Sequence, residues 1–121
     1  MATAAQRRAT GEYGEASAAR WLAQQGMVLI DRNWRCELGE IDLVLRDGDV
    51  LVVCEVKTRS SAAFGSPFEA VTPAKLARLR RLAARWLSER EVRVAEIRID
   101  LVGVRLDLGG DSRFEHVRGV G

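Results

Sequence analysis

Residues 39–59 read GEIDLVLRDGDVLVVCEVKTR, and this stretch decides the fold. Two runs rich in apolar residues, 39–46 and 50–59, flank the polar triplet at 47–49. A two-residue loop that begins with Gly48 is typical of a tight hairpin, because glycine readily adopts the positive φ that such turns require. The stretch therefore predicts two adjacent antiparallel strands.

The turn also fixes which residues face each other across this hairpin. If residues 48–49 form the loop, the numbers of two opposed residues sum to 97, so Asp42 opposes Glu55 and Glu40 opposes Lys57. Opposed residues of an antiparallel pair project from the same face, with Cβ atoms about 5 Å apart. The register therefore predicts two carboxylates side by side, with a lysine close to them.

Both faces of the predicted hairpin are apolar near the turn, which is typical of a central hairpin covered on both sides. One face is expected to hold Ile41, Leu43, Leu45, Val52, Cys54 and Val56. The other is expected to hold Val44, Leu51 and Val53 together with Asp42 and Glu55. The charged residues interrupt the apolar pattern at one end only, and a local rule broken in this way indicates a functional site.

Two carboxylates facing each other beside a core repel unless a cation or a proton intervenes. Mg²⁺ takes oxygen ligands, keeps several waters, and often needs only one or two carboxylates plus a substrate phosphate. Lys57 is placed to hold or help deprotonate an attacking water, or to stabilise charge on a phosphate. The alternative is a pair of cross-strand ion pairs at an exposed strand end, Glu40–Lys57 and Asp42–Arg59.

The segment before the hairpin predicts a helix and then a short strand. Residues 1–9 are expected to be a disordered tail, and the helix is expected over 10–25, with Thr10 as N-cap and Gly26 after its last turn. A short apolar strand follows at 27–30. The apolar positions that set the helical spacing are Tyr13, Ala16, Ala19 or Arg20, and Ala23.

The segment after the hairpin predicts a loop over 59–67, a second helix, and further strands within 92–106 and 113–117. Thr72 followed by Pro73 is a strong helix start, and that helix is expected to run to about residue 90. Its apolar stripe is Leu76, Leu79, Leu82, Ala83, Trp86 and Leu87. The element order predicts a single α/β domain over 10–121, with a central mixed β-sheet and a helix on either face.

Composition excludes several other classes of protein. The chain has 121 residues, of which 47% are hydrophobic and 30% charged, as in an ordinary globular domain. It lacks an apolar stretch of the roughly 20 residues that a membrane span needs, and we expect a cytoplasmic protein. Cys36, Cys54 and the lone His116 are too few and too scattered for a structural zinc site, and His116 is expected to be an ordinary surface or edge residue.

The motif GEIDLV at 39–44, followed by EVKTR at 55–59, resembles the signature of PD-(D/E)xK nucleases, with Ile41 where the named proline would stand. More closely, the chain resembles the YraN-like family of uncharacterised bacterial proteins. The resemblance extends to Gly11-x-x-Gly14-Glu15-x-x-Ala18, Asn33, Lys75 and Ile99-Asp100. It implies a restriction-endonuclease-like fold, close to the Holliday-junction resolvases.

The resemblance also implies roles for individual residues. Asp42 and Glu55 match the metal-binding acids, Lys57 the catalytic lysine, and Glu15 an additional acid around Mg²⁺ or Mn²⁺. The alternative for Glu15 is a favourable interaction with the dipole of its helix, if it lies in the first turn. Glu40 is expected to support the ligands from beside them, or to form an ion pair.

Basic residues are candidates for phosphate contacts, since such contacts dominate the affinity of nucleic-acid binding. The candidates are Arg59, Lys75, Arg78, Arg81 and Arg85. The last three share one helix face, which would otherwise be a solvated surface. Only Lys57 and Lys75 among the 19 basic residues are lysine, and the net charge of +2 does not by itself indicate a nucleic-acid-binding protein.

The sequence thus predicts a metal-dependent nuclease that hydrolyses DNA phosphodiester bonds, with branched recombination or repair intermediates as one substrate class. Resolvase-like nucleases that cut two strands are commonly dimers, so a homodimer is one expected arrangement. The alternative is a module that binds nucleic acid or protein and retains the fold without turnover. Asp100 lies in an apolar run and is expected either to support the site or to bind an arginine.

Overall fold

The structure is a computed structural model that describes residues 3–60, 68–69, 71–107, 110 and 112–120. Its elements, in chain order, are α1 (Ala4–Gln24), β1 (Val28–Cys36), β2 (Gly39–Asp47), β3 (Val50–Ser60), α2 (Pro73–Ser88), β4 (Glu96–Leu106) and β5 (Ser112–Val117). No helix among these residues is long and apolar enough to cross a membrane.

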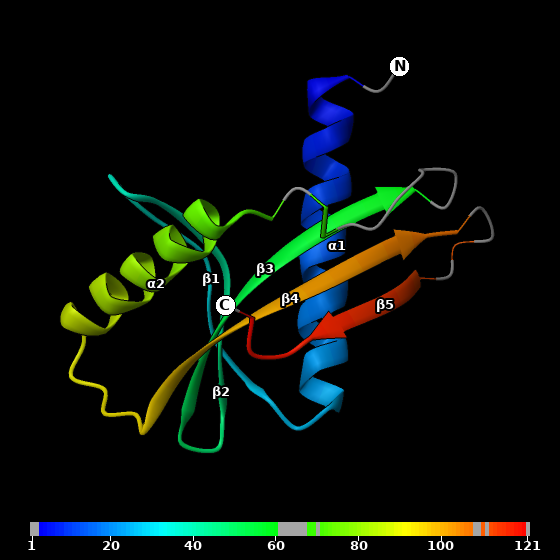
Figure 1. Cartoon of the computed structure of the whole chain (residues 1–121). Coiled ribbons are helices and arrows are strands. Elements are labelled where there is room, and N and C mark those ends of the chain that lie inside the picture. Colours follow the sequence, from blue (N-terminus) through cyan, green and yellow to red (C-terminus); the bar gives the residue numbers. More distant parts are fainter. Residues whose placement is uncertain (1–2, 61–67, 70, 108–109, 111, 121) are drawn as a thin grey trace.

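The strands form one sheet in the order β1-β2-β3-β4-β5 (Figure 1). Only β3 and β4 run parallel, while the other neighbouring pairs are antiparallel. The chain returns from β3 to β4 through α2, the helical crossover that a parallel pair requires. The predicted α/β class with a mixed sheet is confirmed.

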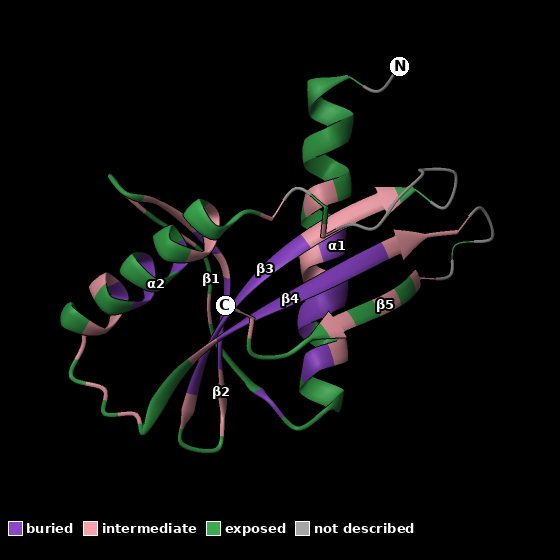
Figure 2. Ribbon diagram, in the orientation of Figure 1, coloured by how far each residue is buried: buried purple, intermediate pink, exposed green. Residues whose placement is uncertain are grey.

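Each helix covers its own face of the sheet, and buried residues lie between helix and sheet on both sides (Figure 2). The α1 side of the core includes Ala18, Leu22, Leu43, Leu45, Val52, Cys54, Val56, Val102 and Val104. The α2 side includes Ile41, Val44, Leu51, Val53, Leu79, Leu82, Ala83, Trp86 and Ile99. The hairpin is therefore central and covered on both faces, as expected. The predicted apolar stripe of α2 is the face that packs on the sheet.

The predicted hairpin register is confirmed from the turn as far as the pair Leu43–Cys54. The described ladder between β2 and β3 ends there, one pair before Asp42. The Val56 amide instead donates to Asp42 Oδ2 at 2.8 Å. Asp42 and Glu55 still line one hollow, as their predicted pairing implied, but the Asp42 side chain takes the place of a backbone acceptor and the two residues lie beyond the end of the ladder.

The same irregularity moves Ile41 to the other face of the sheet. Strict alternation places Ile41 with Leu43 on the α1 side, whereas the structure packs Ile41 into the core under α2 and Leu43 into the core under α1. The side-chain period of two therefore breaks between these residues. This break occurs where β2 carries Asp42.

Helix α1 begins earlier than the sequence indicated. Thr3 is its N-cap: the Thr3 hydroxyl accepts from the Gln6 amide at 3.1 Å, and the Gln6 side chain accepts from the Thr3 amide at 2.7 Å. This reciprocal capping box satisfies two backbone donors at the helix start. The expected disordered tail is therefore helical over residues 4–9, while residues 1–2 lie outside the described part.

The buried face of α1 also differs from the predicted one, since Tyr13 is 47% exposed. The buried positions are Gly14, Ser17, Ala18, Ala19 and Leu22. Most of these side chains are small, which lets the helix backbone lie close to the sheet.

The other elements follow the prediction with shifted boundaries. Thr72 caps α2 as expected, and its hydroxyl accepts from the Lys75 amide at 3.1 Å. Strand β1 continues to Cys36 instead of ending near residue 30. The expected loop over 59–67 overlaps the end of β3, which reaches Ser60, and residues 61–67 lie outside the described part.

Gly14 sets the distance between α1 and β3. A Cβ atom at this position would overlap the Thr58 hydroxyl and lie 2.9 Å from both Thr58 Cβ and Cγ2. Only glycine fits so close to the strand, and Glu15 is the next residue of the helix. The close approach therefore determines where the Glu15 carboxylate meets the sheet.

We expect Gly14→Ala to lower the free energy of unfolding by about 1–3 kcal/mol, the usual cost of an overpacked contact. In a Thr58→Gly background the clash is gone, and Gly14→Ala should be neutral or stabilising, since alanine favours helix by about 1 kcal/mol. Denaturant unfolding of the wild-type protein, the two single variants and the double variant measures both effects. Stabilisation by Gly14→Ala in the wild-type background would contradict the assigned contact.

Candidate active site

The two central carboxylates meet where β2 and β3 part. Asp42 comes from β2 and Glu55 from β3, and the Glu55 side chain is only 10% exposed. Both line a hollow of about 200 Å³ between the hairpin and α2. The remaining lining residues are Glu40, Lys75, Arg78, Leu79 and Leu82.

Two lysines contact the same oxygen of Glu55. Lys75 Nζ lies 2.8 Å from Glu55 Oε1, and Lys57 Nζ lies 3.4 Å from that atom. Lys57 belongs to the same strand as Glu55, whereas Lys75 reaches the site from the first turn of α2. The structure therefore gathers Asp42, Glu55, Lys57 and Lys75 into one cluster, and we call these four residues the acid–lysine cluster.

The Asp42 carboxyl has a strongly perturbed pKa. Burial and the nearby negative charge of Glu55 raise the pKa from 3.8 to about 7, against the hydrogen bond from the Val56 amide, which lowers it. Glu15 and Glu40 add smaller upward contributions. Charge at this position is therefore costly unless a cation or a proton lies close by.

The pKa values of the two lysines are shifted in opposite directions. Burial, and then the contact with Lys75, lower the pKa of Lys57 below its usual value. Burial also acts to lower the pKa of Lys75, but the contacts with Glu55 and Lys57 and the negative charges of Glu55 and Asp42 together outweigh it, so the pKa is raised. The positive charge of Lys75 is therefore the more firmly held of the two.

Glu15 reaches the site from α1. It lines a hollow of about 380 Å³ beside Val56 and Thr58, and a second of about 270 Å³ beside Asn33 and Glu40. Burial raises the pKa of Glu15, although a hydrogen bond with Asn33 opposes the shift. Because α1 begins at Ala4, Glu15 lies about three turns from the helix start, so the dipole interpretation of this residue was wrong.

The cross-strand ion pairs considered as an alternative do not form. Glu40 Oε2 lies 3.3 Å from Arg35 Nε in the neighbouring strand, and Lys57 turns to Glu55. Glu40 nevertheless borders the hollow of Asp42 and Glu55 as well as the hollow of Glu15. Its expected place beside the ligands therefore fits the geometry.

The expected phosphate-binding residues are only partly gathered at the site. Arg78 lines the hollow of the carboxylates, whereas Arg81 is exposed on α2. Arg85 is bound to Glu37 at 2.7 Å, in the turn between β1 and β2. Arg59 lies near the end of β3, in register with Arg105 of β4.

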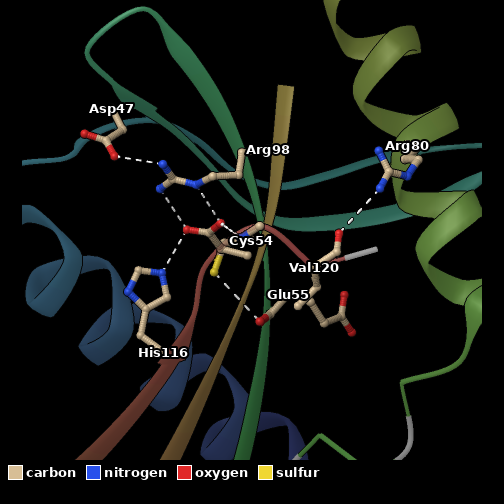
Figure 3. A network of polar contacts seen from close by, with 9 residues as sticks. Asp47, Cys54, Glu55, Arg80, Arg98, His116 and Val120 are labelled. Atoms are coloured by element: carbon tan, nitrogen blue, oxygen red, sulfur yellow. Dashed lines mark hydrogen bonds and ion pairs between the residues drawn. The ribbon is translucent and has the colours of Figure 1, made fainter. Parts of the chain in front are cut away.

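Asp100 is fully buried in a polar network that includes Arg98, Asp47 and His116, and Figure 3 shows these three partners. Arg98 Nε and His116 Nε2 lie 2.9 and 2.8 Å from its two oxygens, and the Gly119 amide donates at 3.1 Å. Arg98 also pairs with Asp47 at 3.1 Å. Of the two expectations for Asp100, arginine binding is the one that the structure supports.

His116 lies in the edge strand β5, one of its two expected places, but its side chain is not on the surface. Its side chain is only 7% exposed, and its ring meets Trp21 edge-on with centroids 5.6 Å apart. Burial acts to raise the pKa of Asp100, but hydrogen bonds from Arg98, His116 and the Gly119 amide outweigh it, so the pKa is lowered. The pair His116–Asp100 therefore anchors β5 and the segment that follows it.

The carboxylates of Asp42 and Glu55 are suitable ligands for a divalent cation, but two side chains do not complete its coordination. Among the described residues, no group of three or more His, Cys, Asp or Glu side chains is close enough to form a complete metal cage. Two carboxylates with unfavourable mutual charge do converge, and Mg²⁺ commonly uses one or two carboxylates together with water and substrate phosphate. The donor set therefore fits a magnesium site that substrate and water complete.

Two features of the site were missed from the sequence. Lys75 was expected to bind nucleic acid, yet it lies on Glu55, and Asn33 holds Glu15 from a left-handed backbone conformation with φ of 50°. The signals for Lys75 were the scarcity of lysine and its place in the resemblance to the YraN-like family. A signal for Asn33 was its tolerance of positive φ next to a predicted strand end.

These features define an α/β protein with two helices on a five-stranded mixed sheet and a recessed acid–lysine cluster. A family model described as "Uncharacterised protein family UPF0102" matches residues 14–104. A UPF0102 protein of Nocardioides sp. is 66% identical over 120 residues, covering 99% of this chain and 97% of the relative. A UPF0102 protein of Beutenbergia cavernae is 60% identical over 113 residues, covering 93% and 96%. The chain belongs to the UPF0102 family, as its YraN-like motifs predicted.

We expect Asp42→Asn to raise the Tm of the metal-free protein by several degrees at about pH 8, and the gain to disappear near pH 4. The pKa of Asp42 is 3.8 ordinarily and about 7 in the folded protein. Ionised Asp42 therefore lowers the stability of the fold. This loss is absent at a pH below the lower pKa and complete at a pH above the higher pKa. Asparagine keeps an oxygen that accepts the Val56 hydrogen bond. Thermal unfolding in EDTA across this range measures the difference.

The matched control is Asp49→Asn in the exposed turn, where the side chain is 84% exposed. Its effect on the Tm should not grow with pH. A wild-type protein that gains stability relative to Asp42→Asn as the pH rises would contradict the assigned cost.

Proposed function

We propose that this protein is a metal-dependent nuclease that hydrolyses phosphodiester bonds in DNA and that its sheet and helices form a restriction-endonuclease-like fold. One observation carries the proposal: Asp42 and Glu55 line a single hollow where the central hairpin opens, and Lys57 Nζ lies 3.4 Å from Glu55. This trio matches the acidic residues and lysine of the PD-(D/E)xK signature. The fold supports the proposal because it has a central mixed sheet flanked by helices.

In this proposal Asp42 and Glu55 hold Mg²⁺ or Mn²⁺, with Glu15 assisting from α1 and Glu40 beside them. When bound, such a cation supplies positive charge for the scissile phosphate and lowers the pKa of water. The Val56 amide holds the Asp42 carboxylate in place by its 2.8 Å hydrogen bond. Carboxylates fixed in this way need little reorganisation when the substrate arrives.

Lys57 acts on the nucleophile or on the phosphate. Its ammonium lies 3.4 Å from Glu55 and its side chain is 30% exposed, so a water or a phosphate oxygen can reach it. An amine at this place can orient the attacking water, accept its proton, or stabilise the charge that develops on the phosphate. Arg78 lines the same hollow and is the best-placed arginine for a phosphate contact.

Substrate, assembly and compartment follow the expectations from the sequence. Branched recombination or repair intermediates are the proposed DNA class, and a homodimer is the arrangement suited to cutting two strands. Cys36 and Cys54 are both free thiols, which fits a reducing compartment such as the cytoplasm.

A second candidate function is a nucleic-acid- or protein-binding module without turnover. One observation favours it: Lys75 Nζ lies 2.8 Å from Oε1 of the buried Glu55, so the charge of this carboxylate has a partner without a metal. The two candidates differ in whether the acid–lysine cluster performs chemistry.

We expect the wild-type protein to cleave plasmid or branched DNA when Mg²⁺ or Mn²⁺ is present, and Asp42→Ala to abolish cleavage because a metal ligand is lost. Gel analysis of the products over time measures the rate. Binding of DNA without cleavage in either protein would favour the non-catalytic module. Equal cleavage by both proteins would reject the proposed site.

We expect Lys57→Arg to slow cleavage by on the order of a hundredfold, since a planar guanidinium that does not release a proton replaces a compact ammonium. Arginine keeps the positive charge and the ion pair with Glu55. The Tm and the affinity for Mn²⁺ should therefore change little, which separates chemistry from folding. An undiminished cleavage rate would reject the role of Lys57.

A further inference from the structure

Lys75 is fixed at the site by the start of α2. Its amide donates to the Thr72 hydroxyl at 3.1 Å in the N-cap, and its ammonium lies 2.8 Å from Glu55 Oε1. The side chain of Lys75 is 26% exposed and that of Glu55 is 10% exposed. The ion pair therefore joins α2 to the centre of the sheet in a partly shielded place.

The acid–lysine cluster is balanced in charge without a metal. When all four groups are ionised, the carboxylates of Asp42 and Glu55 are matched by the ammonium groups of Lys57 and Lys75. A carboxylate as buried as Glu55 is costly without such a partner. A divalent cation added to this balanced cluster would leave an excess of positive charge in a shielded recess.

A divalent cation that binds Glu55 Oε1 competes for this oxygen with the two ammonium groups already in contact with it. Lys75 is the candidate for displacement because it makes the shorter contact and comes from a different element, so its side chain can leave without disturbing the strand of Glu55. It also lines the hollow together with Arg78, and the hollow gives it a place to move.

We propose that Lys75 is an internal cation that occupies the metal's place on Glu55 and that a divalent cation must displace it. The inference rests on the proposed function, because it requires a metal at Asp42 and Glu55. Displacement frees a positive charge beside the metal, where a substrate phosphate would lie. Metal binding thereby prepares the site for the phosphate.

Lysine suits this role better than arginine. An ammonium is a compact, strongly hydrated charge on a flexible stem, whereas a guanidinium grips a carboxylate with two parallel hydrogen bonds. The chain uses lysine at only two positions among 19 basic residues, and both contact Glu55. An arginine at position 75 would be harder to displace.

The test is calorimetric titration with MnCl₂ of the wild-type protein, Lys75→Gln, Lys75→Arg, Asp42→Asn and the matched control Arg78→Gln. Lys75→Gln should bind Mn²⁺ roughly tenfold more tightly, since an ion pair no longer competes for the oxygen. Lys75→Arg should bind more weakly than wild type. Arg78→Gln removes the same charge from the same hollow without freeing Glu55, and should change the affinity by less than about threefold.

The outcomes separate this inference from the proposed function. If wild type binds Mn²⁺, Asp42→Asn does not, and Lys75→Gln binds no more tightly than wild type, the inference is overturned and the metal site stands. If binding is absent from every variant, both are overturned. Lys75→Arg provides an independent test if Lys75→Gln folds poorly, and tighter binding by Lys75→Arg would also overturn the inference.

Discussion

The hydrogen bond from the Val56 amide to the Asp42 carboxylate determines the form of the site. At this point the ladder between β2 and β3 ends. The Asp42 side chain accepts the hydrogen bond from the Val56 amide that a backbone carbonyl would otherwise accept. The carboxylate is thereby fixed inside the protein, close to Glu55, at the cost of a pKa raised to about 7. Ile41 turns to the opposite core in the same place. The lysines gathered nearby offset the charge that this arrangement creates.

Local signals were sufficient for most of the fold. The Gly48 turn and the apolar runs on either side specified the hairpin and its register, and Thr72-Pro73 specified the start of α2. The start of α1 was missed because residues 4–9 are exposed and carry no apolar face, so only the Thr3 capping box marks it. The buried face of α1 was misassigned because small residues, not large ones, pack on β3.

The site was predictable where it depends on one hairpin and less so where distant elements meet. Asp42, Glu55 and Lys57 lie in adjacent strands, so register alone brought them together. The contact of Lys75 with Glu55 and that of His116 with Asp100 join separate elements, and no local pattern encodes such a distance. Lys75 changes how the carboxylate pair is interpreted. Two opposed carboxylates need a positive charge nearby, and the ammonium of Lys75 supplies part of that charge.

The central claim is that Asp42 and Glu55 together hold a divalent cation. Crystals soaked in MnCl₂ and measured for anomalous scattering test it most directly, because the position of manganese is observed without reference to activity. We expect an anomalous peak in contact with both carboxylates, with the Lys75 ammonium moved away from Glu55. An absent peak in well-ordered crystals, with Lys75 still bound to Glu55, would contradict it.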